Sequence, residues 1–131
     1  MNEMKKVLVL GMALALLVLA GCAQGAETAT YKNMSVDELN ERMEKEDFFL
    51  VDVHIPEEQH IKGTDLFISY LDVKENADKF PDDKDEVIVV YCRSGNMSMD
   101  ASLDLIDMGY ANVYNVPGGV NAWKAAGYPM E

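Results

Sequence analysis

The residues best suited to chemistry lie around Cys92, which directly follows the β-branched run Val87–Tyr91. A cysteine attacks as a thiolate, and this anion needs hydrogen-bond donors nearby. Small and turn-forming residues follow it, and they let a chain curl so that successive backbone N–H groups point inward, with the positive end of the next helix added. We therefore predict that a nucleophilic Cys92 sits in an anion-holding loop of Arg93, Ser94, Gly95, Asn96, Met97 and Ser98.

Three other roles are open to a lone cysteine at this position. A small buried hydrophobe at the end of a strand is one, but such a residue needs no Arg-Ser-Gly-Asn loop after it. A phosphatase or an arsenate reductase shares the anion cradle, but its loop is longer and ends in arginine, where this chain has Ser98. A thiol redox protein needs a nearby resolving cysteine, and the only other cysteine is Cys22. The loop composition favours the nucleophile.

A second group of polar residues follows the apolar run 48–53. Asp52, at the end of this predicted strand, is expected to anchor loop amides rather than to act as a base. His54 is a candidate helper near the mouth of the pocket. His54 and His60 are six residues apart and lack a third ligand, which makes a poor zinc set. We therefore expect no metal site.

Helical and strand patterns alternate along the chain, which is typical of an α/β fold. Ser35 and Glu38 form a capping-box start, and Val87–Tyr91 predicts a central strand. This order implies right-handed crossovers and a mostly parallel sheet covered on both faces, with the ligand site beyond the carboxyl ends of the strands. The predicted helices are 35–46, 71–80, 98–108 and 120–126, with a short one begun at Pro56, and the predicted strands are 48–53, 66–68, 87–91 and 113–116.

The first 30 residues have the pattern of an export signal followed by a tether. Lys5 and Lys6 precede an uninterrupted apolar run of 14 residues, Val7–Ala20, which is shorter than the ~20 residues that a bilayer span needs. Leu19–Cys22 resembles the bacterial lipobox, in which the cysteine becomes the first residue of the mature protein and is acylated. We predict a lipoprotein signal peptide at 1–21, a flexible tether at 22–30 and one domain at 31–131, anchored through Cys22 to the cell envelope.

Charge and cysteine count narrow the possible partners. Without residues 1–21, the chain keeps 9 basic and 22 acidic side chains, a formal charge of −13. Such a negative domain is a poor partner for nucleic acid. If Cys22 carries the lipid, Cys92 is left as a lone thiol in an oxidising compartment, where it is a liability unless it is buried or used.

The Cys92 loop and three other segments of the chain resemble the rhodanese family, and the resemblance extends over about residues 31–129. Four sequence segments carry the resemblance. They are Leu50, Val51, Asp52 and Val53 with Pro56 and Glu57; His60, Ile61 and Gly63; Cys92, Arg93, Ser94, Gly95 and Asn96; and Gly118, Gly119, Ala122, Trp123 and Gly127. The resemblance implies a five-stranded, mostly parallel sheet with helices on both faces.

The resemblance also implies an activity, which is transfer of sulfane sulfur through a persulfide on Cys92 without a metal or organic cofactor. The expected partners are a small sulfur-containing donor such as thiosulfate, or a protein persulfide, and a thiophilic acceptor. Family members often carry arginine where this chain has Met97 and His54. We therefore expect weak binding of thiosulfate. The alternative is a non-catalytic rhodanese-like module that binds a ligand or partner at the cell envelope.

Overall fold

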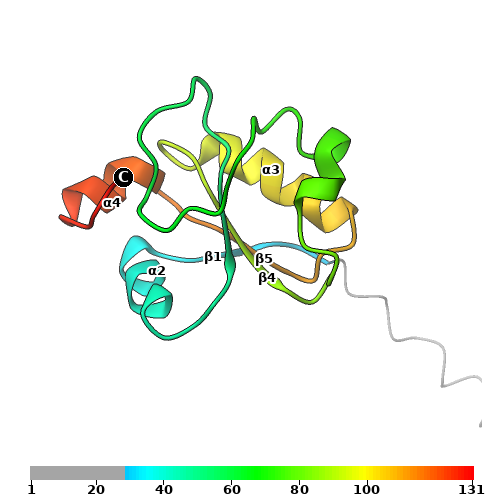
Figure 1. The fold of residues 1–131 in the computed structure, drawn as a ribbon, viewed down its shortest axis with the longest axis horizontal. Coiled ribbons are helices and arrows are strands. Elements are labelled where there is room, and N and C mark those ends of the chain that lie inside the picture. Colours follow the sequence, from blue (N-terminus) through cyan, green and yellow to red (C-terminus); the bar gives the residue numbers. More distant parts are fainter. Residues whose placement is uncertain (1–28) are drawn as a thin grey trace, which may run out of the picture.

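The computed structural model describes residues 29–131, which fold around a five-stranded parallel sheet (Figure 1). The strands are β1 (Lys32–Asn33), β2 (Phe49–Asp52), β3 (Leu66–Phe67), β4 (Val87–Tyr91) and β5 (Asn112–Asn115). The helices are α2 (Val36–Met43), the 3₁₀ helix η1 (Lys74–Lys79), α3 (Asn96–Asp107) and α4 (Gly119–Ala125). The strand order β1-β5-β4-β2-β3 makes β4 the central strand, as its apolar run predicts.

Helices cover both faces of the sheet, so the predicted α/β fold is confirmed. On one face, Val51, Val90 and Val113 pack with Leu105 of α3. On the other face, Leu50 and Val89 pack with Leu39 of α2 and Trp123 of α4. Figure 1 shows α3 and η1 on one side of the strands and α2 on the other. Strands β2, β4 and β5 therefore direct alternate residues into opposite cores, as expected for a parallel sheet with two covered faces.

The register of the strands brings their carboxyl ends to one edge of the sheet. Asp52 at the end of β2 is paired with Tyr91 at the end of β4. On the other side of β4, Val90 is paired with Asn115 of β5, and Asn115 is paired with Asn33 of β1. This edge is where ligands bind in open α/β sheets, and Cys92 follows β4 directly.

Two helix predictions were wrong. No helix begins at Pro56, because the polar groups there bond locally in a loop, with the His54 amide donating to Asp52 and the His54 ring hydrogen-bonded to the Pro56 carbonyl. The predicted helix 71–80 is a shorter 3₁₀ helix with non-helical backbone at Asn76. None of its residues is buried, so it has no apolar face that would hold a longer α-helix against the sheet.

Smaller differences concern the ends of the elements. The Ser35 hydroxyl accepts a hydrogen bond from the Glu38 amide, 3.1 Å away, and caps α2 as predicted, but α2 ends earlier, at Met43. α3 begins two residues before the predicted start, at Asn96. The edge strand β1 was not predicted, because two exposed polar residues give no strand pattern.

The predicted signal peptide, Cys22 and most of the tether lie outside the described residues. Within residues 29–131, no helix has the length and apolar character needed to span a bilayer.

Candidate active site

Cys92 is held at the start of the predicted loop with its side chain inside the protein. The residue is only 1% exposed. Its Sγ accepts a hydrogen bond from the Gly95 amide at 3.0 Å and lies 3.4 Å from the Ser98 hydroxyl. Both are groups that hydrogen-bond a sulfur anion, so the loop provides donors to a thiolate on Cys92.

The backbone at Gly95 turns the loop into α3. Gly95 has a φ of +105°, a conformation that glycine adopts without strain, and it is the N-cap of the helix. Within the described part of the chain, no side chain caps this helix, which leaves its start suited to hold an anion. Ser98, in the first turn, is fully buried and directs its hydroxyl to the sulfur. Asn96 and Met97 thus belong to the helix rather than to the loop.

Backbone amides at the start of α4 hydrogen-bond to the Cys92 loop, a contact that was not predicted from the sequence. Three successive carbonyls of the loop accept hydrogen bonds from backbone amides at this helix start. The Val120 amide donates to the Cys92 carbonyl at 2.9 Å, the Asn121 amide to Arg93 at 3.0 Å, and the Gly118 amide to Ser94 at 3.2 Å. These contacts direct the three loop carbonyls to the start of α4.

Gly119 must be glycine because the loop packs directly against its α-carbon. A β-carbon there would lie 2.1 Å from the Cys92 carbonyl oxygen and 2.9 Å from the Arg93 carbonyl, far inside contact distance. The Gly118–Gly119 pair was the sequence signal for this contact, since paired glycines mark a close approach of backbones. Only the folded structure shows that the segment they approach is the Cys92 loop.

Comparisons with known proteins identify the family of this chain. The family model of the rhodanese-like domain matches residues 35–126. This chain belongs to the rhodanese family. A thiosulfate sulfurtransferase GlpE from Coxiella burnetii is 34% identical over 98 residues, which cover 72% of this chain and 89% of that protein. A sulfurtransferase from Allochromatium vinosum is 34% identical over 97 residues, with the same coverage.

A solved structure shows the same fold. The solution structure of a rhodanese-like domain from Anabaena superposes on this rhodanese domain with a TM-score of 0.68 at 27% identity. The match covers 76% of this chain and 77% of that one. The arrangement of the sheet and helices is thus that of the family.

Arg93 forms an ion pair with Glu58 at the surface of the rhodanese domain. Its guanidinium contacts the Glu58 carboxylate, and the two side chains are 48% and 45% exposed. Glu58 lies on the loop between β2 and β3, 35 residues away in sequence. The one cation of the Cys92 loop is therefore neutralised by a neighbour rather than directed at the sulfur.

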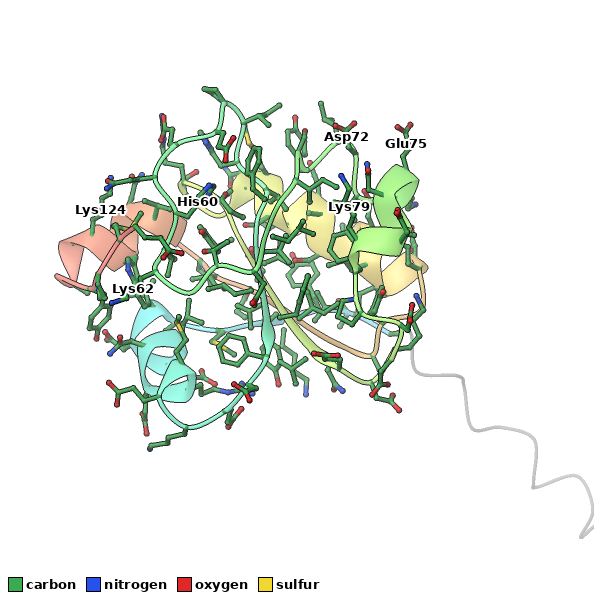
Figure 2. All side chains as sticks on the ribbon, in the orientation of Figure 1. His60, Lys62, Asp72, Glu75, Lys79 and Lys124 are labelled. Carbon is green, nitrogen blue, oxygen red and sulfur yellow. The ribbon has the colours of Figure 1, made fainter. Side chains whose placement is uncertain are left out.

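Beside this ion pair, Asp52, His60 and Glu57 form a chain of hydrogen bonds. The His60 ring nitrogens lie 2.7 Å from Asp52 and 2.9 Å from Glu57, and Figure 2 labels His60 on the loop between β2 and β3. Burial opposes a charge on the ring, but its hydrogen bonds and attraction to the two carboxylates raise the pKa of His60. The other oxygen of Asp52 accepts a bond from the His54 amide, which is the amide contact expected of it.

Two of the predicted site residues, His54 and Met97, are not hydrogen-bond partners of the sulfur within residues 29–131. The His54 ring is hydrogen-bonded to the Pro56 carbonyl at 2.9 Å and contributes no bond to Cys92. Met97 packs against the apolar core under α3, so it anchors the first turn of that helix. Among residues 29–131, no three His, Cys, Asp or Glu side chains are grouped so as to hold a metal ion.

Proposed function

We propose that this protein is a sulfurtransferase that carries sulfane sulfur as a persulfide on Cys92. The observation that carries the proposal is the position of Sγ, 3.0 Å from the Gly95 amide at the start of α3, which no side chain of residues 29–131 caps. Membership of the rhodanese family supports it, as do relatives named as sulfurtransferases. The same donors that favour a thiolate also suit a persulfide anion, whose charge lies one atom further out.

The reaction consists of two displacements at sulfur. The Cys92 thiolate attacks the outer sulfur of a donor such as thiosulfate; a new S–S bond forms, the bond inside the donor breaks, and sulfite leaves with the electron pair. An acceptor thiolate then attacks the outer sulfur of the persulfide. The S–S bond to Cys92 breaks, and its electron pair restores the Cys92 thiolate. The two steps together need no external oxidant or reductant.

Hydrogen bonds stabilise the anion more than the helix dipole does. A helix N-terminus contributes about 0.3–1 kcal/mol, whereas a hydrogen bond to a charged group contributes about 1.5–3 kcal/mol. The Gly95 amide and the Ser98 hydroxyl are therefore the main sources of stabilisation, and the start of α3 adds to them. Ser98→Ala is the variant that tests the hydroxyl alone.

Thiosulfate is a poor match for the charges around this site. After the predicted removal of residues 1–21, the chain carries a formal charge of −13. Arg93 is paired with Glu58, and an apolar Met97 packs into the core. We propose that donors of lower charge density, such as a protein persulfide, are used in preference to thiosulfate. Met97→Arg adds a long cation that reaches past the core surface, so it should lower the KM for thiosulfate. An unchanged or higher KM contradicts this account.

The experiment that tests the proposal is loading of the cysteine. The protein is incubated with thiosulfate or with a protein persulfide, and its intact mass is measured for a one-sulfur adduct. Turnover is then followed with cyanide as acceptor. Cys92→Ser should abolish the adduct, and Cys22→Ser, which changes the only other cysteine, should retain it. No adduct from either donor would overturn the proposal and favour a non-catalytic binding module.

We also propose that the protein is exported and anchored to the bacterial cell envelope through a lipid on Cys22. The argument rests on the order of Lys5, Lys6, the apolar run 7–20 and the lipobox-like Leu19–Cys22. Metabolic labelling with a fatty-acid analogue tests it. Cys22→Ala should lose the label and accumulate unprocessed in the cell, and labelling that persists in this variant would refute the anchor.

A further inference from the structure

A pocket of about 260 Å³ lies beside the Cys92 loop, on the flank away from Glu58. Ser94 and Gly95 of the loop line it, together with Met99 of α3 and with Asn33 and Asn115 at the ends of β1 and β5. All of its lining residues are uncharged. The pocket is therefore a polar but neutral site on a strongly acidic protein.

Asn115 is the unusual residue of this pocket. It is 3% exposed, and its side-chain oxygen has no hydrogen-bond partner among residues 29–131. A buried polar atom without a partner costs about 1–3 kcal/mol, and buried polar groups are almost always paired. The backbone of Asn115 is satisfied, since its carbonyl accepts the Met34 amide at 2.8 Å. The missing partner is thus a donor for the side chain, and the pocket is the space from which one can come.

Asn115 lies on the same face of the sheet as the reactive cysteine. Val113 packs in the core under α3, and side chains two residues apart on a strand point to the same face, so Asn115 faces α3 as well. Cys92 belongs to that same core. Gly95, which donates its amide to the sulfur, lines the pocket with its neighbour Ser94. A molecule in the pocket would therefore touch the loop that carries the sulfur.

The chemistry of the pocket fits a peptide group. A carboxamide offers one acceptor oxygen and an NH₂ donor, and these complement the N–H and C=O of a peptide bond. A carboxylate has no N–H to give to the Asn115 oxygen and would be repelled by the negative domain. Tyr31 and Met99 supply apolar surface for an adjoining side chain.

We propose that this pocket binds a peptide group of the sulfur acceptor and so positions the acceptor thiol beside Cys92. This inference rests on the proposed function, because it names the acceptor of the second displacement. The acceptor would be a cysteine within a peptide or protein, with a neighbouring backbone N–H donating to the Asn115 side chain. Its thiolate then attacks the outer sulfur of the persulfide, forms the new S–S bond and returns the electron pair to Cys92.

The first test compares two acceptors in a single turnover. Protein loaded with one sulfur on Cys92 is mixed with N-acetylcysteine methylamide, which has peptide groups, or with 2-mercaptoethanol, which has none. Asn115→Leu keeps the size of the side chain but removes its amide. The ratio of the two transfer rates, peptide thiol over plain thiol, should fall about tenfold in this variant, the loss expected for a hydrogen bond of about 1.4 kcal/mol. An unchanged ratio overturns the proposal.

Asn112→Leu is the matched control. Asn112 is at the other end of β5, where its side-chain NH₂ donates to the Asp85 carbonyl at 2.7 Å, outside the pocket. The same chemical change on the same strand should leave the ratio of rates as it is in the wild type. An equal fall of this ratio in both variants would mean that any such change in β5 lowers it, and would overturn the proposal.

The second test needs neither a variant nor a loaded cysteine. Wild-type protein is titrated with N-acetylserine methylamide, which has the same peptide groups without a thiol, and the amide resonances are followed by NMR. The side-chain NH₂ of Asn115 and the backbone of Ser94 and Gly95 should shift in a saturable way. An absence of shifts at these residues overturns the proposal that the pocket binds a peptide group. Failure to load Cys92 overturns the proposed function instead, so the two outcomes are separate.

Discussion

The two flanks of the Cys92 loop have opposite character. On one flank, Asp52, His60, Glu57, Glu58 and Arg93 are all engaged in ion pairs or hydrogen bonds. On the other flank, the pocket of Asn33 and Asn115 is uncharged, and the Asn115 side-chain oxygen has no partner among the described residues. Polar groups that are paired with one another stabilise the fold, whereas a buried polar atom without a hydrogen-bond partner is available to bind a ligand. The charged flank thus supports the loop, and the neutral flank is the one suited to binding.

Both flanks depend on the contact between α4 and the loop, so breaking that contact should have the largest effect. In Gly119→Ala, the added β-carbon meets the Cys92 carbonyl oxygen, 2.1 Å away, and the loop must move. We expect a loss of about 3 kcal/mol or more in the free energy of unfolding, with loss of activity. Urea unfolding measures the change in the free energy of unfolding.

Gly127→Ala is the matched control for this prediction. Gly127 also has a positive φ, +80°, but nothing lies within 4 Å of an added β-carbon. Only the backbone strain remains, which costs about 1 kcal/mol. If both variants lose the same stability, close packing against Cys92 is not the reason for glycine at position 119.

The charged flank can be tested through pH. The pKa of His60 is raised in the folded protein, so its bonds to Asp52 and Glu57 stabilise the fold most fully below its unfolded value of about 6.5. This contribution is lost as pH rises through the folded pKa. The free energy of unfolding should therefore fall by on the order of 1 kcal/mol from about pH 6 to pH 8. His60→Gln should lack this fall, and an unchanged profile in that variant would show that other groups cause it.

On the neutral flank, loss of a polar side chain should not lower the free energy of unfolding. Asn115→Leu removes a side-chain oxygen that has no partner among residues 29–131, so the free energy of unfolding should stay the same or rise by up to about 1 kcal/mol. Asn112→Leu removes the hydrogen bond to Asp85, so this variant should lose about 0.5–1 kcal/mol. Thermal unfolding of both variants checks the difference. A clear loss of stability in Asn115→Leu would mean that its side chain has a structural partner.

The smallest expected effect concerns the ion pair at the edge of the charged flank. Glu58→Gln releases Arg93, which can then attract an anionic donor. The KM for thiosulfate should fall about two- to threefold, in line with the modest energy of an exposed ion pair. Glu57→Gln removes the same charge from the neighbouring residue, which contacts His60 instead. An equal fall in both would attribute the effect to net charge rather than to Arg93.

Local patterns predicted much of the fold and the centre of the site. The β-branched run gave the bounds of β4, and Ser35 with Glu38 gave the start of α2. The position of Cys92 between a strand and a helix followed from neighbouring residues in the same way. The failures were also local, since a helix was predicted at 71–80 where the structure buries only Val73 and Phe80, just outside the 3₁₀ helix.

The sequence alone determined the family, the alternation of strands and helices from α2 onward except at Pro56 and 71–80, and the place of Cys92 at the end of the central strand. These depend on residue type and on spacing within one element. Only the tertiary structure decided that α4 amides hold the loop, that Arg93 pairs with Glu58, and that the Asn115 side-chain oxygen, in the pocket beside the loop, has no partner among residues 29–131. Each of these joins residues from different elements, and whether a polar group finds a partner depends on geometry that no local pattern encodes.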